Sequence, residues 1–166
     1  MFILTLRVHL VKRWGETMKD KVAIGTVVGL LADMTKLLFN YLAFRLHFTN
    51  VVFWQIAAAR FLERNDLFKP MAYFIGAVTD LTVASIIGVL FIYFLHFTGR
   101  DSIWLKGAGF SLVIWVIVLG TLLVQSQTKL NLQSTDVFVT FLAHLVYGFS
   151  LAFATGKLYK LPTRPV

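Results

Sequence analysis

The sequence has 166 residues, of which 58% are hydrophobic and 15% aromatic, and its mean hydropathy is +0.76. Soluble domains are about 45–50% apolar, so this composition excludes an ordinary soluble domain and predicts an integral membrane protein. The absence of cysteine excludes disulfides, thiolate nucleophiles and cysteine-ligated metals. The formal net charge of +8 is explained by membrane topology rather than by a nucleic-acid partner, because Lys and Arg accumulate in cytoplasmic loops.

The chain begins with a segment that differs from the rest. Residues 1–20 lack the apolar core and small-residue cleavage site of a secretory signal peptide, and we expect them to form a cytoplasmic arm. Because "MKDKVAIG" from Met18 is typical of the start of a membrane protein, residues 1–17 are either a start-site extension or an arm along the membrane surface.

Residues 21–160 are predicted to form a single membrane domain. Four apolar stretches each exceed the ~20 residues that a helix needs to cross a bilayer. Helices satisfy their own backbone groups in lipid, so the fold class is all-α, an integral membrane four-helix bundle. The predicted spans are residues 22–45, 70–97, 103–125 and 135–157, and residues 161–166 form a short tail.

The connection between the first two spans is expected to contain one further helix, over residues 50–68. Its apolar part is only about 13 residues long, too short to cross a membrane. We expect an amphipathic interfacial helix, capped by Asn50, with Phe53 and Trp54 dipped toward lipid. A re-entrant segment is the alternative.

The remaining connections carry helix-start signals. Pro70 suits the first turn of the second span, where its missing N–H costs nothing. We expect Asp101 or Ser102 to cap the third span and Ser134 or Thr135 to cap the fourth.

The charged residues outside the spans predict the orientation. An even number of spans places both termini on one side of the membrane, and that side holds ten Lys and Arg residues against five on the other. Since cytoplasmic loops are enriched in Lys and Arg, we expect both termini in the cytoplasm. The ten are Arg7, Lys12, Arg13, Lys19, Lys21, Arg100, Lys106, Lys157, Lys160 and Arg164, and the five are Arg45, Arg60, Arg64, Lys69 and Lys129.

Three of the predicted spans combine a row of small residues with one ionisable residue at the same helical spacing. Residues four apart lie on one face of a helix, and small residues there let helix backbones approach closely in lipid. We therefore expect these faces to point inward, toward one another. The helix-packing residues are Gly25 and Gly29 in the first span, Gly76, Ala84 and Gly88 in the second, and Gly148, Ala152 and Gly156 in the fourth.

The same faces bring a polar cluster to the middle of the predicted bundle: Asp33, Lys36, Asn40, Asp80 and His144. With His144 neutral, two acids and one base leave the cluster at −1, and burial penalises such uncompensated charge. The cluster is therefore a candidate relay for H⁺ or another small ion. Asp33 and Asp80 would titrate or bind the cation, with Lys36 as counter-ion. His144 would be the pH-responsive partner, and Asn40 would position its neighbours by hydrogen bonding.

The alternative is a non-catalytic structural or accessory subunit of a membrane complex, in which the cluster only fixes helix packing. Other chemistries are disfavoured, so we expect no catalytic residue, no cofactor and no metal. The sequence around Asp33 and Asp80 lacks the glycine-flanked signature of intramembrane aspartyl proteases. Two histidines at one depth for haem are not evident, and Lys36 opposes a stable dication. Because four spans are few for a transport path, the expected partners are the lipid bilayer and either further copies of the chain or another membrane protein.

Two stretches, "GLLADMTKLLFN" at residues 29–40 and "HLVYG" at residues 144–148, resemble small four-span bacterial membrane proteins of the YagU-like and YqhR-like kind. This resemblance implies location in the bacterial cytoplasmic (inner) membrane. It supplies no catalytic residues.

Overall fold

The computed structural model describes residues 21–121 and 129–159, and within these ranges it is helical, with no β-strand. This confirms the predicted all-α class. The helices are α2 (Lys21–Arg45), α3 (Phe53–Ala58), the 3₁₀-helix η1 (Arg64–Asp66), α4 (Pro70–Thr98), α5 (Ile103–Ile114), the π-helix η2 (Trp115–Leu119) and α7 (Ser134–Leu158).

Three of these helices, α2, α4 and α7, are long and apolar enough to cross a membrane. Their bounds lie within one residue of the predicted spans 22–45, 70–97 and 135–157. The third predicted span, 103–125, is present as the shorter apolar helix α5 followed by the π-helix η2. Its last four residues lie outside the part of the chain that the structure describes.

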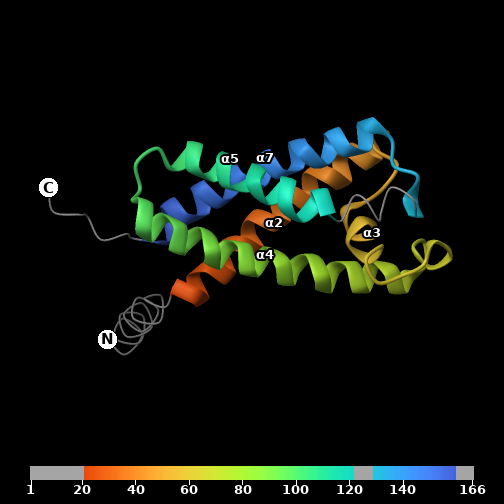
Figure 1. The fold of residues 1–166 in the computed structure, drawn as a ribbon, viewed down its shortest axis with the longest axis horizontal. Helices are drawn as coiled ribbons and strands as arrows, with labels where there is room; N and C mark the ends of the chain where they lie inside the picture. Colours follow the sequence, from red (N-terminus) through yellow and green to blue (C-terminus); the bar gives the residue numbers. More distant parts are fainter. Residues whose placement is uncertain (1–20, 122–128, 160–166) are drawn as a thin grey trace, which may run out of the picture.

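Helix α2 lies between α4 and α7, and α5 packs on α7 (Figure 1). The start of α2, the loop over residues 99–102 and the end of α7 gather at one end of the bundle. The connection over residues 46–69 and the start of α7 gather at the other end. The two ends of the described chain thus lie at the same end of the bundle.

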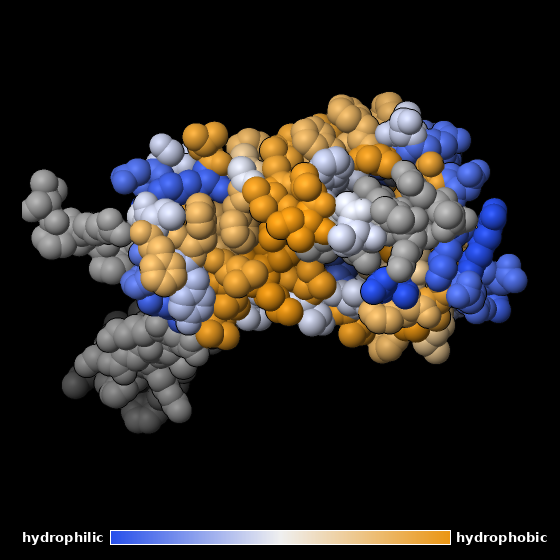
Figure 2. Space-filling model, viewed as in Figure 1, coloured by the Kyte–Doolittle hydropathy of each residue, from blue (hydrophilic) through white to orange (hydrophobic). Residues whose placement is uncertain are grey.

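The face of the bundle shown in Figure 2 is apolar along its middle and hydrophilic toward both ends. Large apolar side chains are exposed on all three long helices, including Met34 (64% exposed), Phe74 (66%) and Phe153 (57%). An apolar belt of this extent is typical of a surface that contacts lipid.

Glycines allow α2 and α4 to touch through their backbones. A Cβ atom at Gly88 would collide with the carbonyl oxygen of Gly25 and would lie 2.6 Å from the Cα and N atoms of Gly29. One turn earlier in α4, the carbonyl oxygen of Ala84 occupies the space beside Gly29. The two helices therefore meet without intervening side chains over this length.

The other small residues contact different neighbours, so the expectation that all three rows face one another is wrong. Gly76 lies against the backbone of Trp54 in α3, at the end of α4 where α3 is wedged between α2 and α4 (Figure 1). Gly148 lies against Gly107 of α5, and Ala152 lies beside Gly107 as well. The carbonyl oxygen of Gly156 accepts a hydrogen bond from Arg100 Nη2 at 2.7 Å.

The segment over residues 50–68 differs from the predicted interfacial helix. Its α-helix has only six residues, five of which are buried, and Phe53 points into the bundle instead of toward lipid. Side chains from elsewhere satisfy its backbone ends: Asn40 Oδ1 accepts from Phe53 N–H at 2.7 Å, and Lys129 Nζ donates to the Ala59 carbonyl oxygen at 3.2 Å. Because the backbone groups at both ends of α3 have hydrogen-bond partners, this short helix can be buried. Asn50 does not cap it, since Val52 is the N-cap residue.

Of the other predicted helix starts, one is confirmed and two differ. Pro70 occupies the first turn of α4, as predicted. Ser102 precedes α5 in a left-handed conformation (φ 52°) without a side-chain cap. For α7 the N-cap residue is Gln133, one residue earlier than predicted, because Asp136 Oδ2 accepts from the Gln133 N–H at 2.7 Å.

The close contact between α2 and α4 gives a testable prediction. Gly88→Ala should destabilise the protein by about 1–3 kcal/mol, because the added methyl group forces the two backbones apart. The matched control is Gly109→Ala, since a Cβ at Gly109 meets nothing within 4 Å. Thermal unfolding of both variants in detergent measures the difference, and equal melting temperatures would contradict the backbone contact.

Candidate functional site

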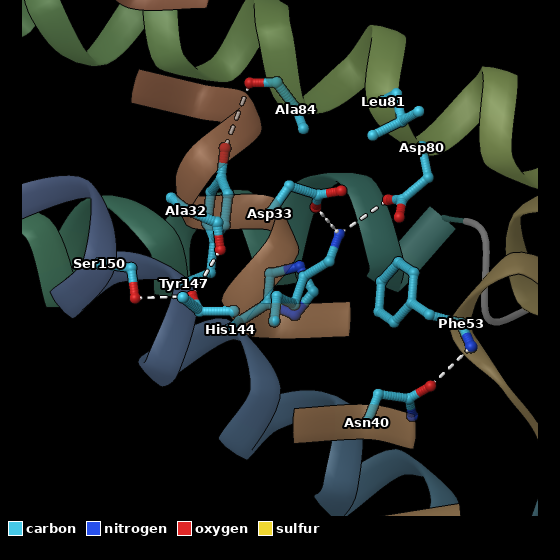
Figure 3. Close-up of polar contacts among 12 residues, drawn as sticks. Ala32, Asp33, Asn40, Phe53, Asp80, Leu81, Ala84, His144, Tyr147 and Ser150 are labelled. Atoms are coloured by element: carbon cyan, nitrogen blue, oxygen red, sulfur yellow. Dashed lines mark hydrogen bonds and ion pairs between the residues drawn. The ribbon is translucent and has the colours of Figure 1, made fainter. Parts of the chain in front are cut away.

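The site is built around the Lys36 side chain, which is buried between two aspartates. Lys36 Nζ lies 2.6 Å from Asp33 Oδ1 on the same helix and 2.7 Å from Asp80 Oδ1 on α4. The exposed fractions are 0% for Asp33, 4% for Lys36 and 5% for Asp80. In Figure 3 the two carboxylates face each other, and the dashed lines that mark these ion pairs converge between them.

Each carboxylate keeps one oxygen that the ion pairs do not use. Asp33 Oδ2 and Asp80 Oδ2 are buried and have no hydrogen-bond partner among the described residues. Two acids and one base sum to −1. The site therefore combines uncompensated negative charge with two unused oxygen atoms, which is unfavourable in an apolar interior unless a proton or another cation is present.

Aromatic rings complete the surroundings of Lys36. The ammonium lies 4.0 Å from the ring centroid of Phe53 and 5.6 Å from that of Tyr147. Such cation–π contacts contribute about 2 kcal/mol when they are desolvated. The Tyr147 hydroxyl donates to the Ala84 carbonyl oxygen at 3.2 Å, which ties α7 to α4 beside the cluster.

His144 reaches the same region but forms no ion pair with either aspartate in the part of the chain that the structure describes. Its Nδ1 lies 2.8 Å from the Thr140 carbonyl oxygen, an atom that can only accept, so Nδ1 carries the hydrogen. The imidazole lies between Phe53 and Tyr147, with ring-centroid distances of 5.7 and 6.4 Å.

A small cavity joins these groups. Its volume is about 40 Å³, and Lys36, Phe53, Asp80, His144 and Tyr147 are among its lining residues. One water molecule needs about 10–15 Å³ measured in this way, so the cavity has room for a few waters. Asp80 and His144 therefore line the same small cavity, although they do not touch.

Asn40 is separate from the ion cluster. Its Oδ1 accepts from the backbone N–H of Phe53, the residue whose ring covers Lys36 (Figure 3). Asn40 thus acts on the site by fixing the start of α3. No group of three or more His, Asp or Glu residues within the described ranges is placed to hold a metal ion.

Sequence reasoning missed Phe53, Tyr147 and Asp136. The two aromatic residues are ordinary in an apolar sequence, and only the folded path of α3 and α7 places them over Lys36. Asp136 is 1% exposed, and its Oδ1 accepts from the Thr49 hydroxyl at 2.7 Å and the Asn50 N–H at 2.8 Å. An acid three residues after a polar residue at a helix start was a usable signal for this capping role.

The buried ion pairs predict a strong dependence of stability on Lys36. Lys36→Met should lower the free energy of unfolding by about 3–5 kcal/mol, because it leaves two buried carboxylates without their cation. Adding Asp33→Asn and Asp80→Asn to this variant should restore much of the loss. Lys69→Met is the control: Lys69 pairs with Asp66 at 2.6 Å in an exposed position, where the same change should cost less than about 1 kcal/mol. Thermal unfolding in detergent is the measurement, and a Lys36→Met variant as stable as Lys69→Met would be inconsistent with the ion pairs.

Comparison with known protein families places the chain in a family. A model of a family of unknown function, DUF6789, matches residues 18–166, which include every residue of the site. No curated protein and no solved structure matched the chain, so the resemblance to YagU-like and YqhR-like proteins gains no support from a named relative. The chain belongs to the family of unknown function DUF6789.

Proposed function

We propose that this protein is a polytopic protein of the bacterial inner membrane that passes or senses a small ion, with H⁺ as the first candidate. The ion would be held at the cluster of Asp33, Lys36 and Asp80. The observation that carries the proposal is the pair of buried carboxylates that share one ammonium and each leave one oxygen without a partner. A proton or a small monovalent cation between these oxygens would bring the net charge of the cluster to zero.

The depth of the cluster supports this role. Asp33 is the central residue of the 25-residue helix α2, and Asp80 reaches the same level from α4. Ionisable groups at mid-membrane depth are expensive and generally mark ion or proton pathways. The cavity beside Asp80 and His144 would supply the space that an ion or a short water chain needs.

The same proposal includes four membrane crossings with both termini in the cytoplasm. Helical structure runs over residues 103–121, which at 1.5 Å per residue extends about 28 Å, close to the ~30 Å of a hydrocarbon core. The distribution of Lys and Arg outside the helices supports the orientation. Since so small a bundle encloses only a small cavity, we propose that it works as a homo-oligomer or with another membrane protein.

A second candidate is a structural or accessory subunit. The observation that favours it is that Lys36 joins α2 to α4 at the level where the glycine contact between these helices ends. In that case the cluster would set the register of the two helices and would exchange no ion.

Proton and cation flux into proteoliposomes distinguishes the two candidates. If the cluster passes an ion, Asp80→Asn should reduce flux at least about tenfold. The protein should stay folded, because the amide keeps the shape of the side chain and only its charge is lost. Asp66→Asn is the control, since Asp66 is a half-exposed aspartate that pairs with Lys69 outside the cluster, and its flux should equal that of the wild type. An Asp80→Asn variant that keeps full flux would exclude the relay. If the wild type shows no flux and Asp80→Asn has a lower melting temperature than the wild type, the structural subunit is favoured.

His144 has its own expected phenotype. His144→Phe keeps a ring between Phe53 and Tyr147 and removes the nitrogen atoms that line the cavity. We expect its flux to fall about as much as in Asp80→Asn. The free energy of unfolding should fall by only about 1 kcal/mol, because only the hydrogen bond to Thr140 is lost. Unchanged flux in this variant would remove His144 from the pathway.

A further inference from the structure

A second polar feature lies on the outside of the bundle, in a groove between α2 and α3. The groove has a volume of about 630 Å³ and is lined mainly by apolar and aromatic side chains of these helices, with Tyr73 of α4 at its edge. Met34 and Leu38, which form part of its wall, are 64% and 58% exposed. No charged residue is among the residues that line it.

Two hydrogen-bond donors in this groove have no acceptor. Asn40 Nδ2 and Trp54 Nε1 are buried and lack a partner among the described residues, and both side chains line the groove. Asn40 is 2% exposed, and its Oδ1 is already used by Phe53 N–H. An unpaired buried N–H group costs about 1–3 kcal/mol, so the groove fits a ligand that brings an acceptor to these two donors.

The depth of the two donors along α2 and α3 indicates which kind of acceptor could reach them. Asn40 lies five residues before Arg45 at the end of α2, which places it about 8 Å inward from that charged end. Met34 lies about 9 Å further inward along the same helix. In a bilayer, the ester carbonyls of phospholipids lie just below the charged headgroups, and the acyl chains run inward from them.

We propose that this groove binds a membrane phospholipid, with an ester carbonyl oxygen that accepts hydrogen bonds from Asn40 Nδ2 and Trp54 Nε1. One acyl chain lies along Leu38 and Met34. The proposal rests on the membrane location put forward above, but it is independent of ion transport. The uncharged lining matches the neutral ester and leaves the phosphate outside the groove, toward Arg45.

Lipid chemistry tests the carbonyl directly. The wild-type protein is purified from mixed micelles that contain equal amounts of a diacyl phosphatidylethanolamine and its diether analogue, which has the same chains and headgroup but no carbonyl. Native mass spectrometry then gives the ratio of the two lipids that remain bound. With two hydrogen bonds at stake, we expect the ester lipid to be favoured about tenfold.

Trp54→Phe keeps an aromatic ring in the groove and removes the Nε1 donor. This variant should lower the preference for the ester lipid at least about threefold. Trp104→Phe is the matched control, because Trp104 is a 52% exposed residue outside the groove, and it should keep the wild-type preference. The melting temperature of each variant shows that it is folded.

Three results would overturn the proposal. The first is equal retention of ester and ether lipid by the wild type, and the second is an equal loss of preference in Trp54→Phe and Trp104→Phe. The third is a lipid-free species of two chains that Trp54→Phe abolishes, which would make the groove a contact between copies of the chain. None of these measurements depends on flux, so the lipid site and the ion site are tested separately.

Discussion

The structure depends on the Lys36 ammonium, which is bound by carboxylates from two helices inside an apolar bundle. Removing charges from water costs several kcal/mol per ion, and only close contacts with opposite charge can offset that cost. These contacts require α4 to approach α2 closely. The backbone contact of Gly29 with Ala84 provides this approach, because it lies one turn from Asp33 on α2 and one turn from Asp80 on α4. The small residues and the charges are therefore two parts of one arrangement.

The opposite half of the site depends on α3, which separates α2 from α4 where their glycine contact ends. This short helix carries Phe53 to Lys36, and it remains in place because its backbone ends bond to Asn40 and Lys129. Asp136 fixes the preceding loop to the start of α7 through Thr49 and Asn50. The polar residues outside the ion cluster thus position the segment that covers it, and the same segment forms the outer groove in which Asn40 and Trp54 present their unpaired donors.

Much of the helical framework could be predicted from the sequence, because the long apolar stretches of α2, α4 and α7 determine both class and boundaries. The spacing of Asp33 and Lys36 also predicted that they share a helix face, and the structure brings them together. The path of α3 could not be predicted, since its burial depends on partners remote in sequence, such as Lys129. For the same reason Asn40, which lies on the helix face of the cluster, bonds to α3 instead. The prediction that the rows of small residues face one another was wrong for α7, where Gly148 packs on Gly107 of α5. Spacing shows that one face of a helix carries small residues, but it does not identify the helix that packs against that face.

Infrared difference spectroscopy of the protein in bilayers can decide whether the cluster holds one exchangeable cation, as proposed. With aspartate carboxyl groups labelled with ¹³C, the spectrum separates a protonated acid from a carboxylate. If the cluster holds such a cation, the wild type shows one of two spectral signatures, and the double variant Asp33→Asn/Asp80→Asn loses it. One is a protonated carboxyl band that shifts in D₂O, and the other is a carboxylate shift on addition of Na⁺. Carboxylate bands that respond neither to D₂O nor to any cation would contradict this proposal, because the cluster would then be a fixed ion trio that exchanges nothing.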